Sequence, residues 1–200
     1  RRDLFHRRYG FASVQTSRGC PMACEFCSVP NFNGRRYRRR PLGEVLDELQ
    51  TIPQRRVIFV DDNLIGYGEH DRQQALELFR GMVQRRLRKW WACQASLNFA
   101  DDEVLHWASR AGCKVVLLGL EAEEPGALAE MNKRLNLRLG VEAYAEIFRR
   151  IHQAGIAVLG AFIFGLDGDT PQKLHRRAGY MIHSGVDGMQ ITFLTPFPGT

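Results

Sequence analysis

The chain has 200 residues, of which 44% are hydrophobic and 25% are charged, a composition typical of a folded globular domain. This composition excludes a disordered tail or a fibrous repeat, and no apolar run approaches the roughly 20 residues that a membrane-spanning helix needs. The net charge of +6 is unevenly spread, because residues 1–40 hold ten arginines and only two acidic residues. That basic segment raises the question of a nucleic-acid partner.

The first predicted strand, residues 11–16, leads into a loop that is rich in cysteine. Three of the five cysteines fall in this loop with the spacing C-x3-C-x2-C, namely Cys20, Cys24 and Cys27. Closely spaced thiolates are soft ligands that suit iron–sulfur clusters and zinc. Structural zinc needs four ligands, and the nearest histidines, His6 and His70, do not have zinc-finger spacing. The pattern favours a cluster with one iron open to a non-protein ligand over a zinc staple or a chance grouping of core cysteines.

Helical periods and apolar strands alternate after this loop. Helices are predicted at 42–50, at 70–86, after the cap Asp101, around 144–151 and from 170 onward. Further strands are predicted at 57–60 and 90–96, from 113 to an end at 119–121, from 156 to an end at 165, and at 189–194. Six strands alternating with five helices indicate an α/β fold with a parallel sheet and helices on its outer face. Right-handed crossovers would wind this sheet into a barrel or a doubly wound sheet.

No internal domain boundary or low-complexity linker interrupts this alternation, so residues 1–200 are expected to form a single domain. The chain begins without Met and without a signal-peptide pattern, which predicts a fragment of a longer cytoplasmic protein. Residues 1–10 are then expected to be a linker from an upstream domain.

Polar residues follow the predicted strands at the edge where ligands collect in such folds. They are Asp61, Asp62, Asn63, Gln94, Ser96, Glu121, Asp167 and Asp169. Because the carboxyl ends of parallel strands lie at one edge, these side chains are expected to surround a zwitterionic, sugar-bearing ligand. Helix capping and loop solvation are the simpler alternative for any one of them.

In this strand and helix context, the cysteine loop resembles that of the radical S-adenosylmethionine (radical SAM) superfamily. The hallmark C-x3-C-x-aromatic-C corresponds here to Cys20, Cys24, Phe26 and Cys27. The resemblance covers nearly the whole chain. It implies a partial (β/α)6 TIM-like barrel, a [4Fe–4S] cluster held by the three cysteines, and S-adenosylmethionine (SAM) bound to the fourth iron.

The same resemblance implies which residues meet the cofactor. Phe26 is expected to lie against the adenine, Glu121 to reach the ribose hydroxyls or the methionine end, and Lys133 to match a basic residue of the following loop. Asp62 stands where the family often has Gly-Gly-Glu, and residues 160–165 resemble a strand whose backbone meets the adenine. The expected cofactor-binding residues are Phe26, Asp62, Gln94, Ser96, Glu121, Lys133, Ile163 and Gly165. No side chain is assigned as a general base.

Finer similarity points to the branch of the superfamily that has a cobalamin-binding domain upstream. It rests on the stretches 18–21, 34–41, 60–63 and 119–121. By that resemblance, an external one-electron donor of flavodoxin or ferredoxin type reduces the cluster. SAM is then cleaved to a 5′-deoxyadenosyl radical, which abstracts hydrogen from a small-molecule or lipid-like substrate. Methylation or ring modification in lipid, tetrapyrrole or secondary metabolism is expected, with cobalamin bound by a domain outside this chain.

The arginine run at 35–40 leaves alternatives open. Tyr37 within it could stack on a base, as in a tRNA-modifying, methylthiotransferase-like enzyme or a zinc-stapled nucleic-acid-binding module. A solvated basic face, or a contact with a neighbouring domain, explains the run more simply, so nucleic acid is not the expected partner. A pure electron-transfer protein would need a fourth cluster ligand, which the cysteine loop lacks. Cys93 and Cys113 are expected to be core residues.

Overall fold

Six parallel strands form one open sheet, and their order across the sheet is their order along the chain. The computed structural model describes residues 9–197. The strands are β1 (Phe11–Val14), β4 (Arg56–Phe59), β5 (Trp90–Ala95), β6 (Cys113–Glu121), β7 (Ala157–Phe164) and β8 (Gly188–Phe193). A doubly wound sheet reverses its strand order at a switch point. This sheet does not, so it winds in one direction as a partial barrel, and the predicted fold class is confirmed.

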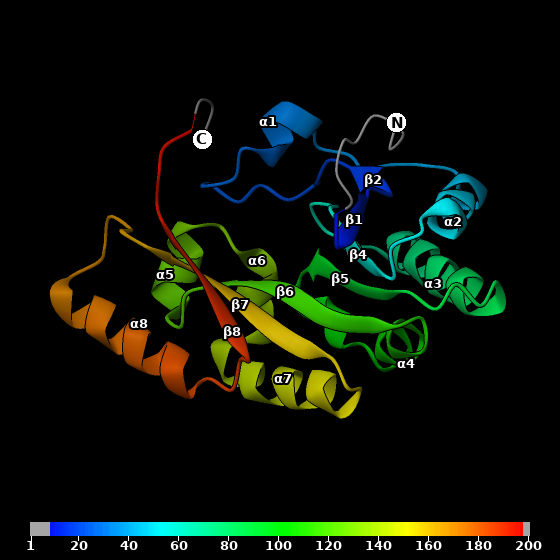
Figure 1. The fold of residues 1–200 in the computed structure, drawn as a ribbon. Helices are drawn as coiled ribbons and strands as arrows, with labels where there is room; N and C mark the ends of the chain where they lie inside the picture. The colour runs from blue at the N-terminus through cyan, green and yellow to red at the C-terminus, as the bar shows by residue number, and fades with distance from the viewer. Residues whose placement is uncertain (1–8, 198–200) are drawn as a thin grey trace.

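The five predicted helices cover the outer face of this sheet (Figure 1). They are α2 (Leu42–Thr51), α3 (Glu69–Gln84), α4 (Asp102–Arg110), α7 (Tyr144–Gln153) and α8 (Pro171–His183). Burial alternates along the strands accordingly: in β4, Val57 and Phe59 are buried, whereas Arg56 and Ile58 are exposed. The main core therefore lies between helices and sheet, and the opposite, concave face is left more open.

An aromatic group fills the core where α3 crosses the sheet. Trp91 of β5 stacks on Phe79 of α3 with ring centroids 5.1 Å apart and meets the edge of Phe59 at 5.3 Å. Its indole nitrogen donates to the Ala111 carbonyl at 3.0 Å, so its polar atom is satisfied. Burying each such side chain contributes about 1.5–3 kcal/mol, and this packing fixes β4 and β5, whose carboxyl ends carry site residues.

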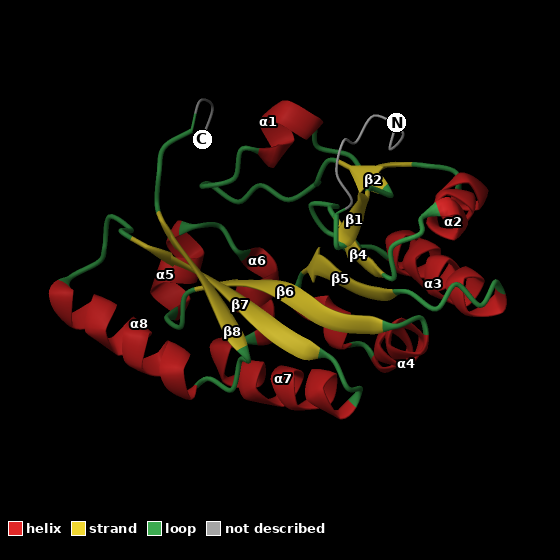
Figure 2. Cartoon of the chain, viewed as in Figure 1, coloured by secondary structure: helices red, strands yellow, loops and turns green. Residues whose placement is uncertain are grey.

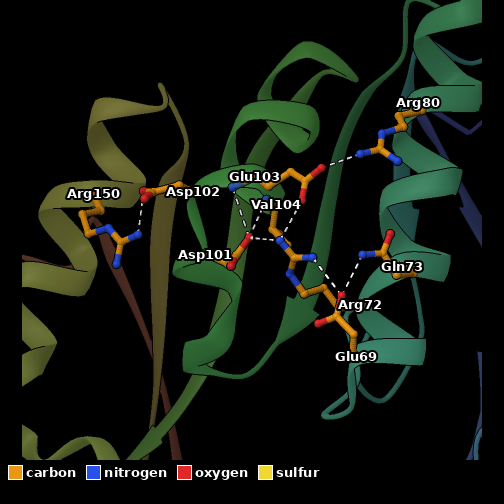
Figure 3. Close-up of polar contacts among 9 residues, drawn as sticks. All are labelled: Glu69, Arg72, Gln73, Arg80, Asp101, Asp102, Glu103, Val104 and Arg150. Atoms are coloured by element: carbon orange, nitrogen blue, oxygen red, sulfur yellow. Dashed lines mark hydrogen bonds and ion pairs between the residues drawn. The ribbon is translucent and has the colours of Figure 1, made fainter.

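Ion pairs tie α3 to the start of α4, on the outside of the sheet (Figure 3). Arg72 donates to Asp101 at 2.9 Å and to Glu103 at 2.8 Å, and Arg80 also pairs with Glu103. Asp101 caps α4 as predicted, accepting from the amides of Glu103 and Val104. Burial alone would raise the pKa of Asp101, but Arg72 and these amides lower it below its ordinary value. The network is fully explained by helix packing and capping.

Several short helices and strands were not predicted from the sequence. They are β2 (Ser17–Arg18), β3 (Arg38–Arg39), α1 (Val29–Asn33), α5 (Pro125–Glu130), α6 (Arg134–Leu139) and the 3-10 turns Leu97–Ala100 and Val141–Ala143. Figure 2 shows the helices and strands of the chain coloured by type. Strands β2 and β3 pair antiparallel as a separate ribbon. Elements this short carry too few residues for a helical or strand period to stand out.

Some predicted boundaries are wrong by a few residues. The first strand ends at Val14 rather than at residue 16, because the Thr16 amide turns aside to bind Asp61. The helix predicted over 70–86 ends at Gln84, and the strand predicted over 90–96 ends at Ala95. Residues 1–8 of the predicted linker lie outside the described residues. No helix of the described residues is long and apolar enough to cross a membrane.

Candidate functional site

Asp61 fastens the start of the cysteine loop to the sheet. It follows β4, the neighbour of β1, and its buried carboxylate accepts from both the amide and the hydroxyl of Thr16, at 3.1 and 2.7 Å. It also accepts from the amide and hydroxyl of Ser17, at 2.5 and 2.7 Å. Because a carboxylate with several donors is a strong anchor, the chain leaves β1 in one fixed direction.

Gly19 lets two loops meet directly before the first cysteine. Its φ is +96°, and a Cβ there would lie 2.2 Å from the Arg36 carbonyl oxygen and 2.8 Å from that of Asn33. The next residue, Cys20, donates its amide to the Gly34 carbonyl at 3.2 Å. Only glycine combines this backbone conformation with such close approach, so the cysteine loop and residues 33–36 are held as one unit.

The three thiols of the cysteine loop are free and half-buried. Burial raises the pKa of Cys24 to about 11; Lys133 opposes this shift, and the neighbouring thiols Cys27 and Cys20 add to it. Burial likewise raises the pKa of Cys27. The Tyr37 hydroxyl lies 3.9 Å from the Cys20 sulfur. The sulfurs are therefore within electrostatic reach of one another, and a metal must displace their protons to bind.

The three thiols are soft donors, which suit an iron–sulfur cluster or zinc. No group of three or more histidine, cysteine, aspartate or glutamate side chains in residues 9–197 is arranged to hold one metal ion. Three soft thiolates on one loop, with no fourth cysteine beside them, match an iron–sulfur cluster with an open iron.

A buried ion pair lies at the end of β6, facing the cysteine loop. The Lys133 ammonium is 2.7 Å from the Glu121 carboxylate, and both side chains are mostly buried. Burial alone would lower the pKa of Lys133, but Glu121 raises it above its ordinary value. The register of β6 against β7 shifts between Gly119 and Glu121, and Glu121 has a φ of +66°. A Cβ on Gly119 would lie 2.6 Å from the Glu121 oxygen and 2.9 Å from the Lys133 nitrogen, so the pair needs glycine below it.

The turn before Lys133 braces the cysteine loop from the other side. The Asn132 side chain donates to the Ala23 carbonyl at 2.6 Å, and the Glu25 amide donates to the Met131 carbonyl at 3.2 Å. Asn132 has a φ of +55°, a conformation that asparagine adopts more readily than most residues. Lys133 is thereby tied to the loop that its charge faces.

Phe26 and Ile163 belong to a second small apolar cluster, separate from the main core. The Lys133 nitrogen lies 5.8 Å from the centre of the Phe26 ring. Gly165, two residues after Ile163, has a φ of +83° and donates its amide to Asp169 at 2.9 Å. The Phe26 ring thus stands next to the ion pair, and a glycine turn follows the strand that carries Ile163.

Asp62, Gln94 and Ser96 stand at the carboxyl ends of β4 and β5. Asp62 accepts from the Gly19 amide at 3.2 Å, and its own carbonyl accepts from the Gln94 amide group at 3.2 Å. Ser96 is buried; its hydroxyl accepts from Asn63 at 3.1 Å and lies 2.6 Å from the Tyr67 hydroxyl. Asp62 therefore borders the cysteine loop directly and Gln94 reaches it through Asp62, whereas Ser96 is engaged with its neighbours.

A cleft of about 390 Å³ opens on the concave face beside these residues. Its apolar lining includes Ile58, Val60, Ala92, Val115, Leu117 and Leu159. Asp62 and Gln94 line its polar part. The cleft can take an apolar molecule next to the cysteine loop.

The expected site residues thus lie in two groups around one loop. Glu121, Ile163 and Gly165 lie at the ends of β6 and β7, with Lys133 from the turn between α5 and α6, and Phe26 comes from the cysteine loop itself. Asp62, Gln94 and Ser96 lie at the ends of β4 and β5. Burial raises the pKa of the Cys27 thiol, and both Asp62 and Lys133 influence it.

Several residues that shape the site were missed from sequence. Tyr67 reaches it only through loop folding, and Tyr37, considered from sequence as a residue that could stack on a base, lies with its hydroxyl toward Cys20 instead. Asn136 is buried and donates to the Gly119 and Leu120 carbonyls. Asn132 had a usable signal, since asparagine just after a helix is a common left-handed end.

The amino-acid sequence matches a protein family and several curated methyltransferases. The family model described as the radical SAM superfamily matches residues 14–179. The chain is 31% identical over 194 residues to the bacteriochlorophyllide d C-12(1)-methyltransferase of Chlorobaculum tepidum, covering 94% of this chain and 41% of that protein. It is 33% identical over 202 residues to the hopanoid C-2 methylase of Rhodopseudomonas palustris, covering 96% of this chain and 37% of that protein.

A solved structure shares the fold. The radical SAM methyltransferase TsrM from Kitasatospora setae, with cobalamin and a [4Fe-4S] cluster bound, aligns with a TM-score of 0.84 at 22% identity. The alignment covers 95% of this chain and 38% of that one. The chain therefore spans about two fifths of the length of these relatives.

Proposed function

This chain belongs to the radical SAM superfamily, and on that premise we propose that it is the catalytic core of a methyltransferase acting on an unactivated carbon. Residues 1–200 form that core as one domain, and cobalamin binds to a part of the enzyme outside it. The observation that carries the proposal is the convergence of three free thiols with the Glu121–Lys133 pair at one edge of the sheet. The methyltransferase names of the two curated relatives support the reaction class.

Cys20, Cys24 and Cys27 would hold a [4Fe–4S] cluster, and SAM would complete it. When bound, these groups supply an electron and a 5′-deoxyadenosyl radical that abstracts hydrogen from the substrate. The residues around them orient the cofactor and exclude water. The thiols need a reducing compartment, which fits a cytoplasmic enzyme served by an external flavodoxin- or ferredoxin-type donor.

Lys133 and Glu121 would bind the polar groups of SAM. The buried ammonium would meet the methionine carboxylate, and the buried carboxylate would accept from the ribose hydroxyls. In the structure the Lys133 ammonium and the Glu121 carboxylate bind each other. The polar groups of SAM would replace part of this interaction. That exchange avoids leaving either charge buried and unpaired.

Phe26 and Ile163 would supply an apolar contact for the adenine, and the backbone at Gly165 would meet its edge. On the opposite side, Asp62 bonds the Gly19 amide and an amide of Asn33 at 3.4 Å. Its carboxylate can accept further donors, so it serves as the partner for the methionine amine. Gln94 and Ser96 complete that side.

The apolar cleft supports a small-molecule or lipid-like substrate over a nucleic acid. A tRNA-modifying activity would place a polar, charged nucleotide there. A zinc-stapled module is disfavoured because the cysteine loop offers three thiols, one fewer than the ligands a structural zinc site needs. The substrate lies in the cleft with its reacting carbon toward the cysteine loop.

An anaerobic preparation of the protein tests the proposal. We expect a brown protein with about four irons per chain that forms 5′-deoxyadenosine after chemical reduction. Cys24→Ala should lose both properties, whereas Cys113→Ala, a change of a buried core cysteine, should retain them. A colourless protein with one zinc would overturn the proposal. Incubation of a host extract with methyl-deuterated SAM then identifies the methylated product.

A further inference from the structure

Four exposed arginines form a surface patch beside the cysteine loop, here called the basic rim: Arg18, Arg35, Arg36 and Arg38. No carboxylate among the described residues forms an ion pair with any of them. The two other arginines of the run differ, since Arg39 pairs with Asp71 at 3.1 Å and Arg40 with Glu48 at 2.6 Å. Of the five arginines of the run, two are thus neutralised, and Arg35, Arg36 and Arg38, like Arg18 outside the run, have no acidic partner among the described residues.

The basic rim lies directly against the residues expected to hold the cluster. In the β2–β3 ribbon, Arg18 pairs with Arg38. Arg18 is also only two residues before Cys20 in the sequence. The Arg36 carbonyl occupies the space that a side chain on Gly19 would need. The Cys20 amide bonds the Gly34 carbonyl, immediately before Arg35. Any protein that covers the rim thus comes close to the cysteine loop.

We propose that the basic rim is the docking surface for an acidic one-electron carrier protein, a partner that the proposed function requires. In this step the carrier is oxidised by one electron and the cluster is reduced by one, with no atom or proton transferred. Charge complementarity steers such encounters and raises association rates by about 10- to 1,000-fold. Encounters between redox proteins are brief and small, typically below about 1,200 Å², which four arginines and a neighbouring apolar residue can provide.

Phe32 of α1 supplies that apolar residue, since it is 72% exposed. Helix α1 is tied to the rim because Arg38 donates to the Asn33 carbonyl at 2.6 Å. An exposed aromatic ring on an element tied to the basic rim is a suitable centre for a transient protein contact.

The contacts of Tyr37 favour a protein over RNA as the partner. Single-stranded RNA is bound by exposed aromatic faces set among basic residues. Tyr37 is the aromatic residue inside the run, but it is half-buried, with its hydroxyl toward Cys20 and its ring 5.2 Å from the Arg39 guanidinium. Within residues 35–40 the aromatic ring is therefore engaged with its neighbours rather than free to stack on a base.

The test is a double charge reversal in the cluster-loaded protein, Arg35→Glu with Arg36→Glu. The matched control reverses Arg56 and Lys114, which are exposed at the opposite, amino-terminal ends of β4 and β6. Bleaching of the cluster absorbance is followed by anaerobic stopped flow, with reduced flavodoxin or with dithionite as donor. Binding of oxidised flavodoxin is measured separately as a function of salt.

We expect the rim variant to react with flavodoxin about 10-fold more slowly or worse, and to bind it more weakly with a smaller salt dependence. The control variant should match the wild type, and dithionite should reduce all three equally. A rim variant that reacts with flavodoxin at the wild-type rate would overturn the inference. The inference would also be overturned if the rim variant were reduced by flavodoxin at the wild-type rate but no longer bound single-stranded RNA that the wild type binds. That result would assign the rim to nucleic acid. Failure of SAM cleavage in every dithionite-reduced protein would instead contradict the proposed function.

Discussion

Gly119 leaves the space in which the Glu121 and Lys133 side chains meet. Gly119→Ala would place a methyl group within 3 Å of both charged atoms. We expect the pair to separate and the affinity for SAM to fall about 10- to 100-fold, as for the loss of a charged hydrogen bond of about 1.5–3 kcal/mol. Equilibrium dialysis with SAM measures this. Gly126→Ala, in open space on α5, should bind SAM like the wild type; equal affinity of the two variants would contradict the assigned role.

Gly19 plays the corresponding part for the cysteine loop. Gly19→Ala combines a left-handed φ with a clash against the Arg36 carbonyl, neither of which a side-chain rotation can relieve. We expect the iron content after anaerobic reconstitution to fall to a small fraction of the wild-type value. Gly10→Ala, with no atom near its added methyl group, is the matched control and should load fully. Full loading of Gly19→Ala would show that the loop tolerates a different path.

At the scale of elements, a buried arginine joins α8 to the loops after β6 and β7. Arg177 is fully buried and pairs with Glu123 at 2.8 Å and with Asp169 at 3.0 Å. It also donates to the Ile163 carbonyl, and Asp169 in turn accepts from the Gly165 amide. The expected adenine-facing backbone is therefore positioned by helix α8.

Removing this arginine leaves two carboxylates buried without their partner. We expect Arg177→Met to lower the free energy of unfolding by about 3–5 kcal/mol. Arg176→Met, which removes an exposed partner of Glu124, should cost about 1 kcal/mol or less. Urea unfolding of the two variants measures the difference, and similar costs would contradict the role of the buried pair.

The stabilisation that Arg177 contributes through Asp169 should depend on pH. Burial alone would raise the pKa of Asp169, but Arg177 and backbone amides lower it below its ordinary value. The stabilisation is thus complete above the unfolded pKa, about 3.9, and is lost as the pH falls through the lower folded pKa. Unfolding curves at pH 6 and in the acid range should show the gap between wild type and Arg177→Met shrinking on acidification. A gap that widens would exclude the ionised pair.

At the scale of the whole molecule, the sheet and its five long helices could be predicted because unbroken apolar runs and amphipathic periods report burial directly. The β2–β3 ribbon and helices α1, α5 and α6 could not, since each depends on contacts made by distant loops. Arg177 shows the same limit: a charged residue on a helix suggests solvent exposure, and only its partners in two loops explain its burial. The cysteine spacing located the site, but its bracing by Asp61 and Asn132 follows from folding.

The central claim is that three cysteines hold a cluster whose open iron binds SAM between two groups of strand-end residues. The EPR spectrum of the reduced protein, recorded before and after adding SAM, tests it most directly. We predict a cluster signal that shifts on adding SAM, because the cofactor binds the iron that lacks a cysteine. A cluster signal that stays identical at saturating SAM would contradict the claim.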